Sequence, residues 1–490
     1  MDVDVVMIGA GFAGLGAAVR LERRGGTSFV VLERAERIGG TWRDNVYPGV
    51  SCDIPSHLYS YSFAPEADWS MLYAPGAEIQ GYLERVVERE GLAPRLRLGT
   101  EVLEAVFDEQ SQRWRVRTSR GDYSAAVLLV CAGRLSEPRL PAVPGLDAFA
   151  GPAFHSARWR EDVDLDGARV GIVGSGASAV QIVPHLAERA AEVVLFQRSA
   201  PYVVPRRNRA YPPHERRTLS RAPGALSRLR EQLFWRAELG FAGRVAVPEA
   251  IDRLRAEALG HLAGQIADPE LRAVLTPNYE IGCKRVLLSD DYYPALAQPH
   301  VSVVPGPLRR IEEGAALGDD DVRHEVDVLV FATGFLSTRP PFARRIRGRD
   351  GLLLADRWAD GMAAYESTAV HGFPSLFVIN GPNASLGHNS SVHMIETQID
   401  YVLAALDHRD AVGADVLEVT AEAEAASVAR LDALSADTVW TNGGCESWYL
   451  DDNRRLTLLW PDFAFAFREE LGRFDPSAYA HGRTVAIVTA

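Results

Sequence analysis

Two short glycine-rich runs have the spacing that lets a backbone wrap around a pyrophosphate. The first run covers residues 9–14 and the second covers 174–179, and each starts with two glycines separated by one residue. Glycine allows the tight turn, and the N–H groups at the start of a following helix attract the phosphate charge. The sequence therefore predicts two dinucleotide sites. The residues expected around the two pyrophosphates are Gly9, Gly11, Gly14, Gly174, Gly176 and Ser178.

The residue that ends the next strand predicts which nucleotide each site binds. Glu33 lies 19 residues beyond Gly14, and Arg198 lies 19 residues beyond Ala179. A carboxylate accepts a hydrogen bond from a ribose 2'-OH and repels a 2'-phosphate, whereas a guanidinium attracts that phosphate. The first site is therefore expected to bind FAD or NAD and the second NADP, with Ser199 as a further hydroxyl donor to the phosphate.

The elements that must hold these runs are a strand before each run and a helix after it. Apolar stretches at 3–8 and 28–32 surround the first run, and apolar stretches at 170–173 and 193–196 surround the second. A buried strand, a glycine turn and an amphipathic helix form the βαβ pattern of a Rossmann fold. The predicted fold class is α/β, with two Rossmann-like dinucleotide-binding domains and a helical insertion in the second.

Changes in composition predict the domain boundaries. Pro138, Pro141 and Pro144 indicate a linker, and the Arg-rich stretch after Pro205 has Leu and Ala at helical spacing. The expected parts are a first segment of the FAD domain at 1–140, the NADP domain at 141–205 and 278–335, the helical insertion at 206–277, and a return to the FAD domain with substrate and lid loops at 336–490.

Composition also excludes some partners. The 490 residues carry a net charge of −13, which disfavours binding to nucleic acid or to an anionic membrane surface. No apolar stretch reaches the ~18 residues of a membrane span, and the first residues do not have the pattern of a signal peptide. We therefore expect a cytoplasmic protein, and the sequence leaves its oligomeric state open.

The four cysteines, Cys52, Cys131, Cys283 and Cys445, lie far apart in the sequence and include no C-x-x-C pair. This spacing predicts neither a zinc site nor a redox dithiol, so we expect four buried free thiols and no metal. A flavin-dependent disulfide reductase needs a cysteine pair beside its flavin, and the spacing disfavours that class.

Three further motifs resemble those of the type I Baeyer-Villiger monooxygenases. Residues 39–53 match the family signature G-G-x-W-x-x-x-x-Y-P-G-x-x-x-D, which includes Trp42 and ends at Asp53. Residues 149–160 follow the fingerprint F-x-G-x-x-x-H-x-x-x-W up to the last position, where the family has Pro or Asp and this chain has Arg160. The third match is the neighbouring pair of Lys284, the one lysine of the sequence, and Arg285.

The resemblance implies FAD and NADPH as cofactors, and a ketone and O2 as substrates. In the family the aspartate lies beside the flavin, the lysine contacts the 2'-phosphate of NADP, and the arginine reaches the flavin and the nicotinamide. By the same resemblance, NADPH would reduce FAD, O2 would add at flavin C4a as a peroxide, and one oxygen would be inserted beside the ketone carbonyl to give an ester or lactone. Arg285 is then expected to stabilise the peroxide and the tetrahedral oxyanion, with Asp53 orienting Arg285.

Two alternatives remain at this point. Arg160 is what the related N- and S-oxygenating flavin monooxygenases have at its position, and a non-oxygenating NADPH dehydrogenase or oxidase would share both nucleotide folds. His155 is expected to set domain geometry rather than transfer protons.

Three loops complete the expected site. His388 lies in the loop 380–390, which is expected to close over the flavin, and this histidine is assigned no chemistry. The loops 337–350 and 441–452 are expected to form a mobile lid and part of the substrate wall.

Overall fold

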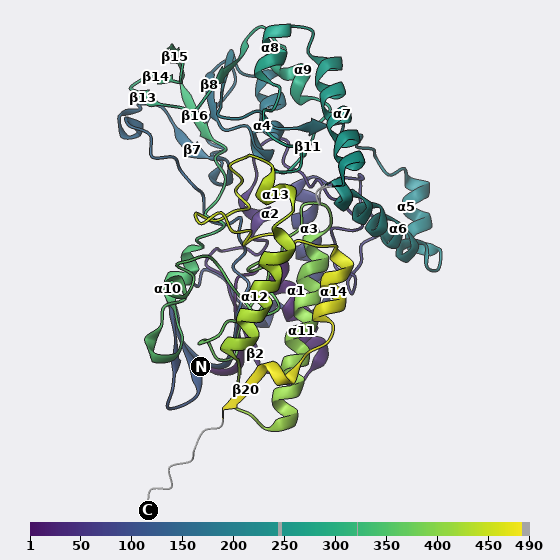
Figure 1. Ribbon diagram of the computed structural model, residues 1–490, viewed down its shortest axis with the longest axis vertical. Coiled ribbons are helices and arrows are strands. Elements are labelled where there is room, and N and C mark those ends of the chain that lie inside the picture. The colour runs from purple at the N-terminus through teal and green to yellow at the C-terminus, as the bar shows by residue number, and fades with distance from the viewer. Residues whose placement is uncertain (244–246, 321, 483–490) are drawn as a thin grey trace, which may run out of the picture.

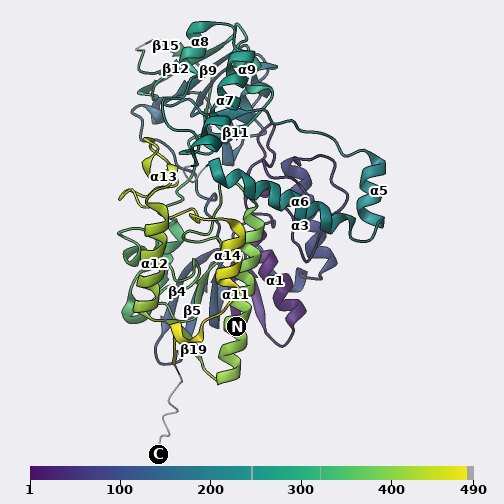
Figure 2. The ribbon, with the colours of Figure 1, turned by 45° about the vertical axis from the view of Figure 1, so that its right-hand side comes forward.

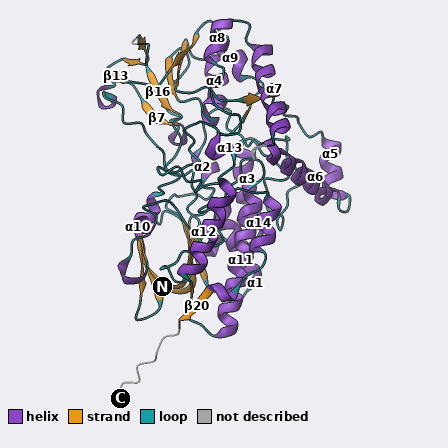
Figure 3. Ribbon diagram, in the orientation of Figure 1, coloured by secondary structure: helices purple, strands orange, loops and turns teal. Residues whose placement is uncertain are grey.

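The chain forms two bodies built on parallel strands, one above the other, and it passes between them twice (Figure 1). The computed structural model describes residues 1–243, 247–320 and 322–482. Figure 3 shows strands of both bodies in orange, with helices beside them.

The lower body in Figure 1 contains an eight-stranded sheet in which β1 lies between β2 and β6. Residues Val5 to Ile8 pair in parallel with the whole of β2, and all four β2 residues are buried and apolar. In order, the strands are β17 (Ile346–Arg347), β4 (Val102–Asp108), β5 (Arg113–Thr118), β6 (Gly121–Val130), β1 (Asp2–Ile8), β2 (Phe29–Leu32) and β3 (Leu96–Arg97), and β18 (Leu376–Val378) also pairs with β6.

Helices from both ends of the chain pack together in the lower body. α1 (Phe12–Arg24) contacts α11 (Ser391–Val412), which in turn contacts α14 (Ala464–Leu471). Gly16 of α1 allows the close approach, because a Cβ atom there would lie 2.9 Å from Tyr61 and 3.1 Å from Ile399. The remaining elements of this body are α2 (Thr41–Asp44), α3 (Gly76–Arg89), α10 (Leu354–Arg357), α12 (Ala421–Ser435), α13 (Val439–Asn442), β19 (Val416–Val419) and β20 (Tyr479–Gly482).

The upper body contains a five-stranded, fully parallel sheet. In sheet order its strands are β12 (Val301–Pro305), β9 (Glu192–Gln197), β8 (Arg169–Val173), β16 (Val328–Phe331) and β7 (Ala153–His155). α4 (Ala177–Ala187) follows β8 and packs against α9 (Tyr292–Leu296). The smaller strands are β10 (Val203–Val204), β11 (Leu287–Leu288), β13 (Arg310–Glu312), β14 (Ala315–Leu317) and β15 (Arg323–Glu325).

Between β10 and β11 the described residues form the helices α5 (Pro213–Arg221), α6 (Ala225–Leu239), α7 (Pro248–Gln265) and α8 (Pro269–Val274). Of these, α5 and α6 extend toward the lower body, while α7 and α8 pack in the upper body (Figure 1). Figure 2 shows α6 extending beside α3. Arg230 of α6 donates hydrogen bonds to the carbonyl oxygen of His57 and to both oxygens of Ser60, so this helix is fastened to the lower body.

The two crossings between the bodies lie side by side. Pro138 and Phe335 form an antiparallel bridge, the N–H of Arg139 donates to the carbonyl of Gly334 at 2.8 Å, and the N–H of Leu336 donates to that of Glu137 at 2.9 Å. The entry into the upper body is thus hydrogen-bonded to the exit from it.

The predicted α/β fold class with two Rossmann-like cores is confirmed. The expected strand at 28–32 begins one residue later, at Phe29. The N–H and the hydroxyl of Ser28 both donate to the carboxylate of Asp4, and the N–H of Asp4 donates to the hydroxyl of Ser28. Over the described ranges, no helix is both long and apolar enough to span a bilayer. The same residues contain no cluster of three or more His, Cys, Asp or Glu side chains suited to a metal.

Candidate active site

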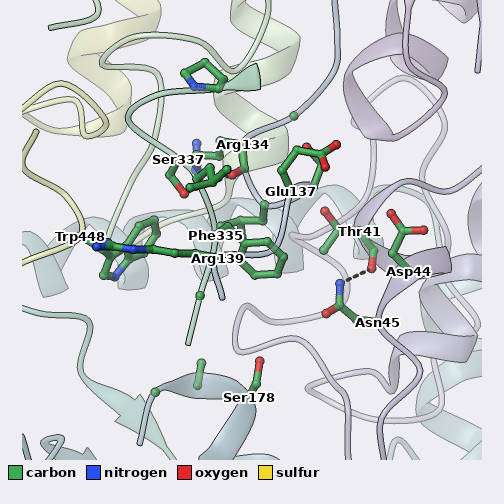
Figure 4. A pocket seen from close by; sticks show the side chains of 18 of the residues that line it. Thr41, Asp44, Asn45, Arg134, Glu137, Arg139, Ser178, Phe335, Ser337 and Trp448 are labelled. Atoms are coloured by element: carbon green, nitrogen blue, oxygen red, sulfur yellow. Dashed lines mark hydrogen bonds between the residues drawn. The ribbon is translucent and has the colours of Figure 1, made fainter. Parts of the chain in front are cut away.

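One cavity of about 1290 Å³ is lined by residues of both bodies. The ends of β1, β2, β8 and β9 contribute to it, as expected for ligands that bind beyond the carboxyl ends of parallel strands. Figure 4 shows part of its lining, with Thr41, Asp44 and Asn45 of the lower body, Ser178 of the upper body, and Trp448.

Two glycines of the first turn leave no room for a side chain. Gly9 has a φ of 105°, and a Cβ atom there would lie 2.5 Å from the carbonyl oxygen of Cys131. At Gly14 a Cβ atom would lie 1.9 Å from the carbonyl oxygen of Gly9, so the helix packs directly on the turn. Gly11 is the N-cap residue of α1, so no side chain of the cap bonds to the first N–H groups of the helix. Residues of this turn line the cavity. These features fit the diphosphate of a dinucleotide such as FAD.

Glu33 is buried at the end of β2, and its carboxylate is fixed by the surrounding chain. It accepts hydrogen bonds from the N–H groups of Ala10 at 2.9 Å and Ala35 at 3.0 Å, and Arg43 Nη1 lies 2.9 Å from Oε1. Arg43 also pairs with Asp44, so it connects Glu33 to the signature loop. Arg43 is a residue that sequence reasoning missed, because the signature leaves its position variable.

The second glycine turn resembles the first at its first glycine. Gly174 has a φ of 104°, and its Cβ atom would lie 2.6 Å from the carbonyl oxygen of Ala332. Gly176 caps α4 without a side-chain hydrogen bond, and a Cβ atom there would meet nothing within 4 Å. Ser178 lies in the first turn of α4 and lines the cavity. The turn therefore fits a second diphosphate.

Three predicted phosphate-binding residues meet at the upper end of the cavity. Lys284 Nζ donates to Ser199 Oγ at 2.8 Å and lies 4.8 Å from the ring centre of Tyr279. Burial and the positive charge of Arg198 lower the pKa of Lys284. Arg198 is exposed and lies 3.7 Å from a carboxylate oxygen of Glu446. Two cations and a hydroxyl at one place are suited to a phosphate monoester.

Arg285 and Asp53 form an ion pair in the same cavity. The Nε and Nη2 atoms of Arg285 lie 2.7 and 2.5 Å from Oδ2 of Asp53, and the two side chains are 24% and 29% exposed. Burial alone would lower the pKa of Arg285, but the charge of Asp53 raises it above the ordinary value. The guanidinium therefore stays charged. Trp42 also lines the cavity, where its ring meets that of Tyr59 edge-on at 5.6 Å.

The loops assigned to the lid and flavin edge contribute to the cavity as well. Ser337, Thr338 and Arg345 line it from the loop 337–350, and residues 445–452 line it from the loop 441–452. His388 does not line the cavity. Its Nε2 lies 3.1 Å from Glu238 of α6, which also accepts a hydrogen bond from Asn389 at 2.6 Å.

His155 and Arg160 lie away from the ion pair. His155 is buried at the end of β7, its Nδ1 accepts from the N–H of Ala157 at 3.1 Å, and its ring packs edge-on against Phe335 of the second crossing. Arg160 is exposed and pairs with Asp162. The residue that departs from the fingerprint therefore does not line the cavity.

The expectation of four free thiols is wrong for two of them. Cys283 and Cys445 form a disulfide, whereas Cys52 and Cys131 are free and buried. The sulfur atoms meet because the loop 441–452 folds back against the segment that precedes Lys284, a proximity that separation in sequence does not reveal. The exclusion of disulfide reductases therefore cannot rest on the cysteine spacing and depends on the relatives.

Comparisons with known proteins identify the relatives. A family model described as pyridine nucleotide-disulphide oxidoreductase matches residues 6–211. A Baeyer-Villiger monooxygenase of Streptomyces coelicolor is 44% identical over 97% of this chain and 92% of its own length. Another, of Pseudomonas aeruginosa, is 40% identical over 97% and 90%.

Solved structures agree with these relatives. An oxidised steroid monooxygenase bound to NADP is 33% identical, with a TM-score of 0.86 over 98% of this chain and 100% of that one. The cyclohexanone monooxygenase of Rhodococcus sp. Phi1 bound to NADP+ is 29% identical, with a TM-score of 0.88 over 98% and 99%. The chain belongs to the Baeyer-Villiger monooxygenases. The predicted class of enzyme, an FAD- and NADPH-dependent flavin monooxygenase, is confirmed.

Proposed function

We propose that this enzyme converts a ketone, O2 and NADPH with a proton into an ester or lactone, NADP+ and water, and that Arg285 and Asp53 are its catalytic residues. The single observation that carries this assignment is the Arg285–Asp53 ion pair in the cavity that both glycine turns also line. Arg160, the residue that favoured N- or S-oxygenation, is exposed and does not line the cavity, which supports oxygen insertion beside a ketone.

The two nucleotide sites are proposed from the fit of their turns. FAD would lie along Gly9, Gly11 and Gly14, with Glu33 at its ribose and Trp42 and Asp53 toward the flavin. NADPH would lie along Gly174, Gly176 and Ser178, with its 2'-phosphate against Arg198, Ser199 and Lys284. When bound, FAD supplies activation of O2 and NADPH supplies the hydride.

Arg285 provides a charge that does not depend on pH in the working range. Its guanidinium would stabilise the negative charge that develops on the carbonyl oxygen as the new C–O bond forms. Asp53 would hold the guanidinium in place through the contacts at Nε and Nη2. A fixed, partly buried cation is worth more than a mobile surface charge, because no reorganisation is needed at the moment of reaction.

The proposed domain bounds are 1–140 with 336–490 around FAD, 141–205 with 278–335 around NADPH, and the helical insertion at 206–277. The positions of α5 to α8 between β10 and β11 support the insertion. The buried His155 ring against Phe335 supports a role in domain geometry. The net charge of −13 supports a protein that does not bind nucleic acid or anionic membrane, and we propose the cytoplasm as its location.

Oxygen labelling tests the reaction. Ketones, amines and sulfides would be incubated with the holoenzyme and NADPH under 18O2, and the products analysed by mass spectrometry. We expect one labelled oxygen in esters or lactones. Labelled amine oxides or sulfoxides without any labelled ester would overturn the proposal in favour of the N- or S-oxygenating class.

A further inference from the structure

Arg134 follows the end of β6 and lines the same cavity as Arg285 (Figure 4). Its Nη1 donates to the amide oxygen of Asn380 at 2.6 Å, and its own carbonyl accepts from Ser337 at 3.1 Å. The guanidinium therefore has a neutral partner. Its Nε is buried and makes no hydrogen bond to any described residue.

The other arginines that line the cavity are either paired with a carboxylate or exposed. Arg139 and Arg454 are exposed to solvent. For Arg134, no carboxylate of the described ranges lies within ion-pair distance, and part of its guanidinium is buried. The paired arginines are Arg34, Arg43, Arg198, Arg285 and Arg345.

This arrangement leaves a positive charge without compensation at the proposed oxygen-insertion end. Burial and, to a smaller extent, the positive charge of Arg285 lower the pKa of Arg134 to about 10, with Tyr449 and Tyr59 acting in the opposite direction. The guanidinium is still charged at neutral pH. A charged group that is partly buried without an acidic partner is costly, so a function must account for it.

The neighbours of Arg134 indicate which ligand would supply the missing acceptor. Its electrostatic partners are Tyr59, Tyr449 of the loop 441–452 and Arg285, none of which belongs to either glycine turn. Asp53 already compensates Arg285. A carboxylate is planar and can bind a guanidinium through two parallel hydrogen bonds, which makes it a suitable partner for arginine.

We propose that Arg134 is a specificity-determining residue that binds a carboxylate of the substrate, so that the enzyme prefers oxo acids to uncharged ketones. This inference rests on the proposed function, because it assumes that the substrate enters this end of the cavity as a ketone.

The test compares 5-oxohexanoate with its methyl ester, which differ in one charge. We expect the wild-type holoenzyme to have a kcat/KM at least 10-fold higher for the acid, since a charge-assisted hydrogen bond is worth about 10- to 100-fold. In Arg134→Gln the ratio of acid to ester should fall by about that factor, through the KM for the acid. Arg134→Lys keeps the charge but loses the two parallel hydrogen-bond donors of the guanidinium, so it should give an intermediate ratio of acid to ester. Arg139→Gln removes an exposed arginine of the cavity rim and is the matched control.

A binding measurement separates this inference from the reaction itself. Titration of oxidised holoenzyme with 5-oxohexanoate, followed by flavin absorbance, should give a dissociation constant that rises in Arg134→Gln and not in Arg139→Gln. If neither probe yields 18O-labelled ester, the proposed function fails while the titration still reports on Arg134.

Two results would overturn the inference. One is a wild-type enzyme with equal kcat/KM values for acid and ester. The other is an equal loss for both probes in Arg134→Gln together with a shifted flavin reduction potential, which would show that the arginine serves the flavin instead.

Discussion

Cys283 and Cys445, which are 162 residues apart in the sequence, are joined by a disulfide directly beside Lys284. The bond fastens the segment that carries Lys284 and Arg285 to the loop 441–452, and the N–H of Glu280 donates to the carbonyl of Gly443 at 3.0 Å in the same region. Both cysteines are buried, in a cluster with Trp440 and Tyr449. A loop expected to be mobile is therefore covalently attached to the proposed NADP-binding segment.

Removal of this disulfide should destabilise the fold. Replacing both cysteines by serine should lower the free energy of unfolding by about 2 to 4 kcal/mol, because the unfolded chain loses a long cross-link. Urea unfolding would measure this, with wild-type protein reduced by dithiothreitol as the comparison. Alkylation of the denatured, unreduced wild type should modify two of its four cysteines. Modification of all four would refute the pairing.

Arg285→Ala should separate NADPH oxidation from oxygen insertion. Without the guanidinium, charge on the substrate carbonyl oxygen loses its stabilisation, so ester formation should fall about 100- to 1000-fold. NADPH should still be consumed, with hydrogen peroxide as the product of O2. Oxygen uptake, peroxide and ester would be measured together, and Arg285→Lys would serve as the charge-retaining comparison. An unchanged ester yield in Arg285→Ala would remove the assigned role.

Lys284→Ala should weaken NADPH more than NADH. The ammonium lies against Ser199 at the proposed 2'-phosphate site, so its loss should raise the KM for NADPH about 10- to 100-fold and leave that for NADH nearly unchanged. Arg198→Ala should act in the same direction with a smaller effect, since Arg198 is exposed. Arg217→Ala, on the exposed surface of α5, is the control. An equal effect on both nucleotides would contradict a phosphate contact.

Two buried histidines should make the fold sensitive to acid. Burial lowers the pKa of His57 and of His155 from 6.5 to about 4, so each remains neutral in the folded state while the unfolded chain takes up a proton. The stability that depends on these groups is complete above pH 6.5 and is lost as the pH falls toward 4, by up to about 3 kcal/mol for each histidine. Urea unfolding between pH 7 and 4.5 should show a smaller loss in His57→Asn or His155→Asn. The variant His214→Asn, at an exposed histidine, should lose as much stability between pH 7 and 4.5 as the wild type. An equally large loss in His57→Asn or His155→Asn would argue that this histidine is not the source of the acid sensitivity.

Local patterns predicted the fold and the two glycine turns, because strand, turn and helix are encoded by neighbouring residues. The strands found at β1, β8 and β9 lie where apolar runs were expected. Glu33 and Arg198, whose contacts with the nucleotides stay predictions, follow β2 and β9 as the fixed offset within one βαβ unit indicated.

Contacts between distant segments were harder to predict. Asp53 and Arg285 are 232 residues apart, and only the family resemblance indicated that they meet. The disulfide was missed because distance along the chain says nothing about proximity in the fold. Arg134 was missed because a single arginine after a strand matches no motif. Its proposed importance depends on having no carboxylate beside it among the described residues, which only the fold reveals.

The paired crossings at Pro138 and Phe335 have a consequence for engineering. Since the chain enters and leaves the upper body through two hydrogen-bonded neighbours, a chimera that exchanges this body with that of a relative needs only two adjacent junctions. The disulfide between Cys283 and Cys445 is a further link between the two bodies, so a chimera must also keep a cysteine at each of these positions or replace both.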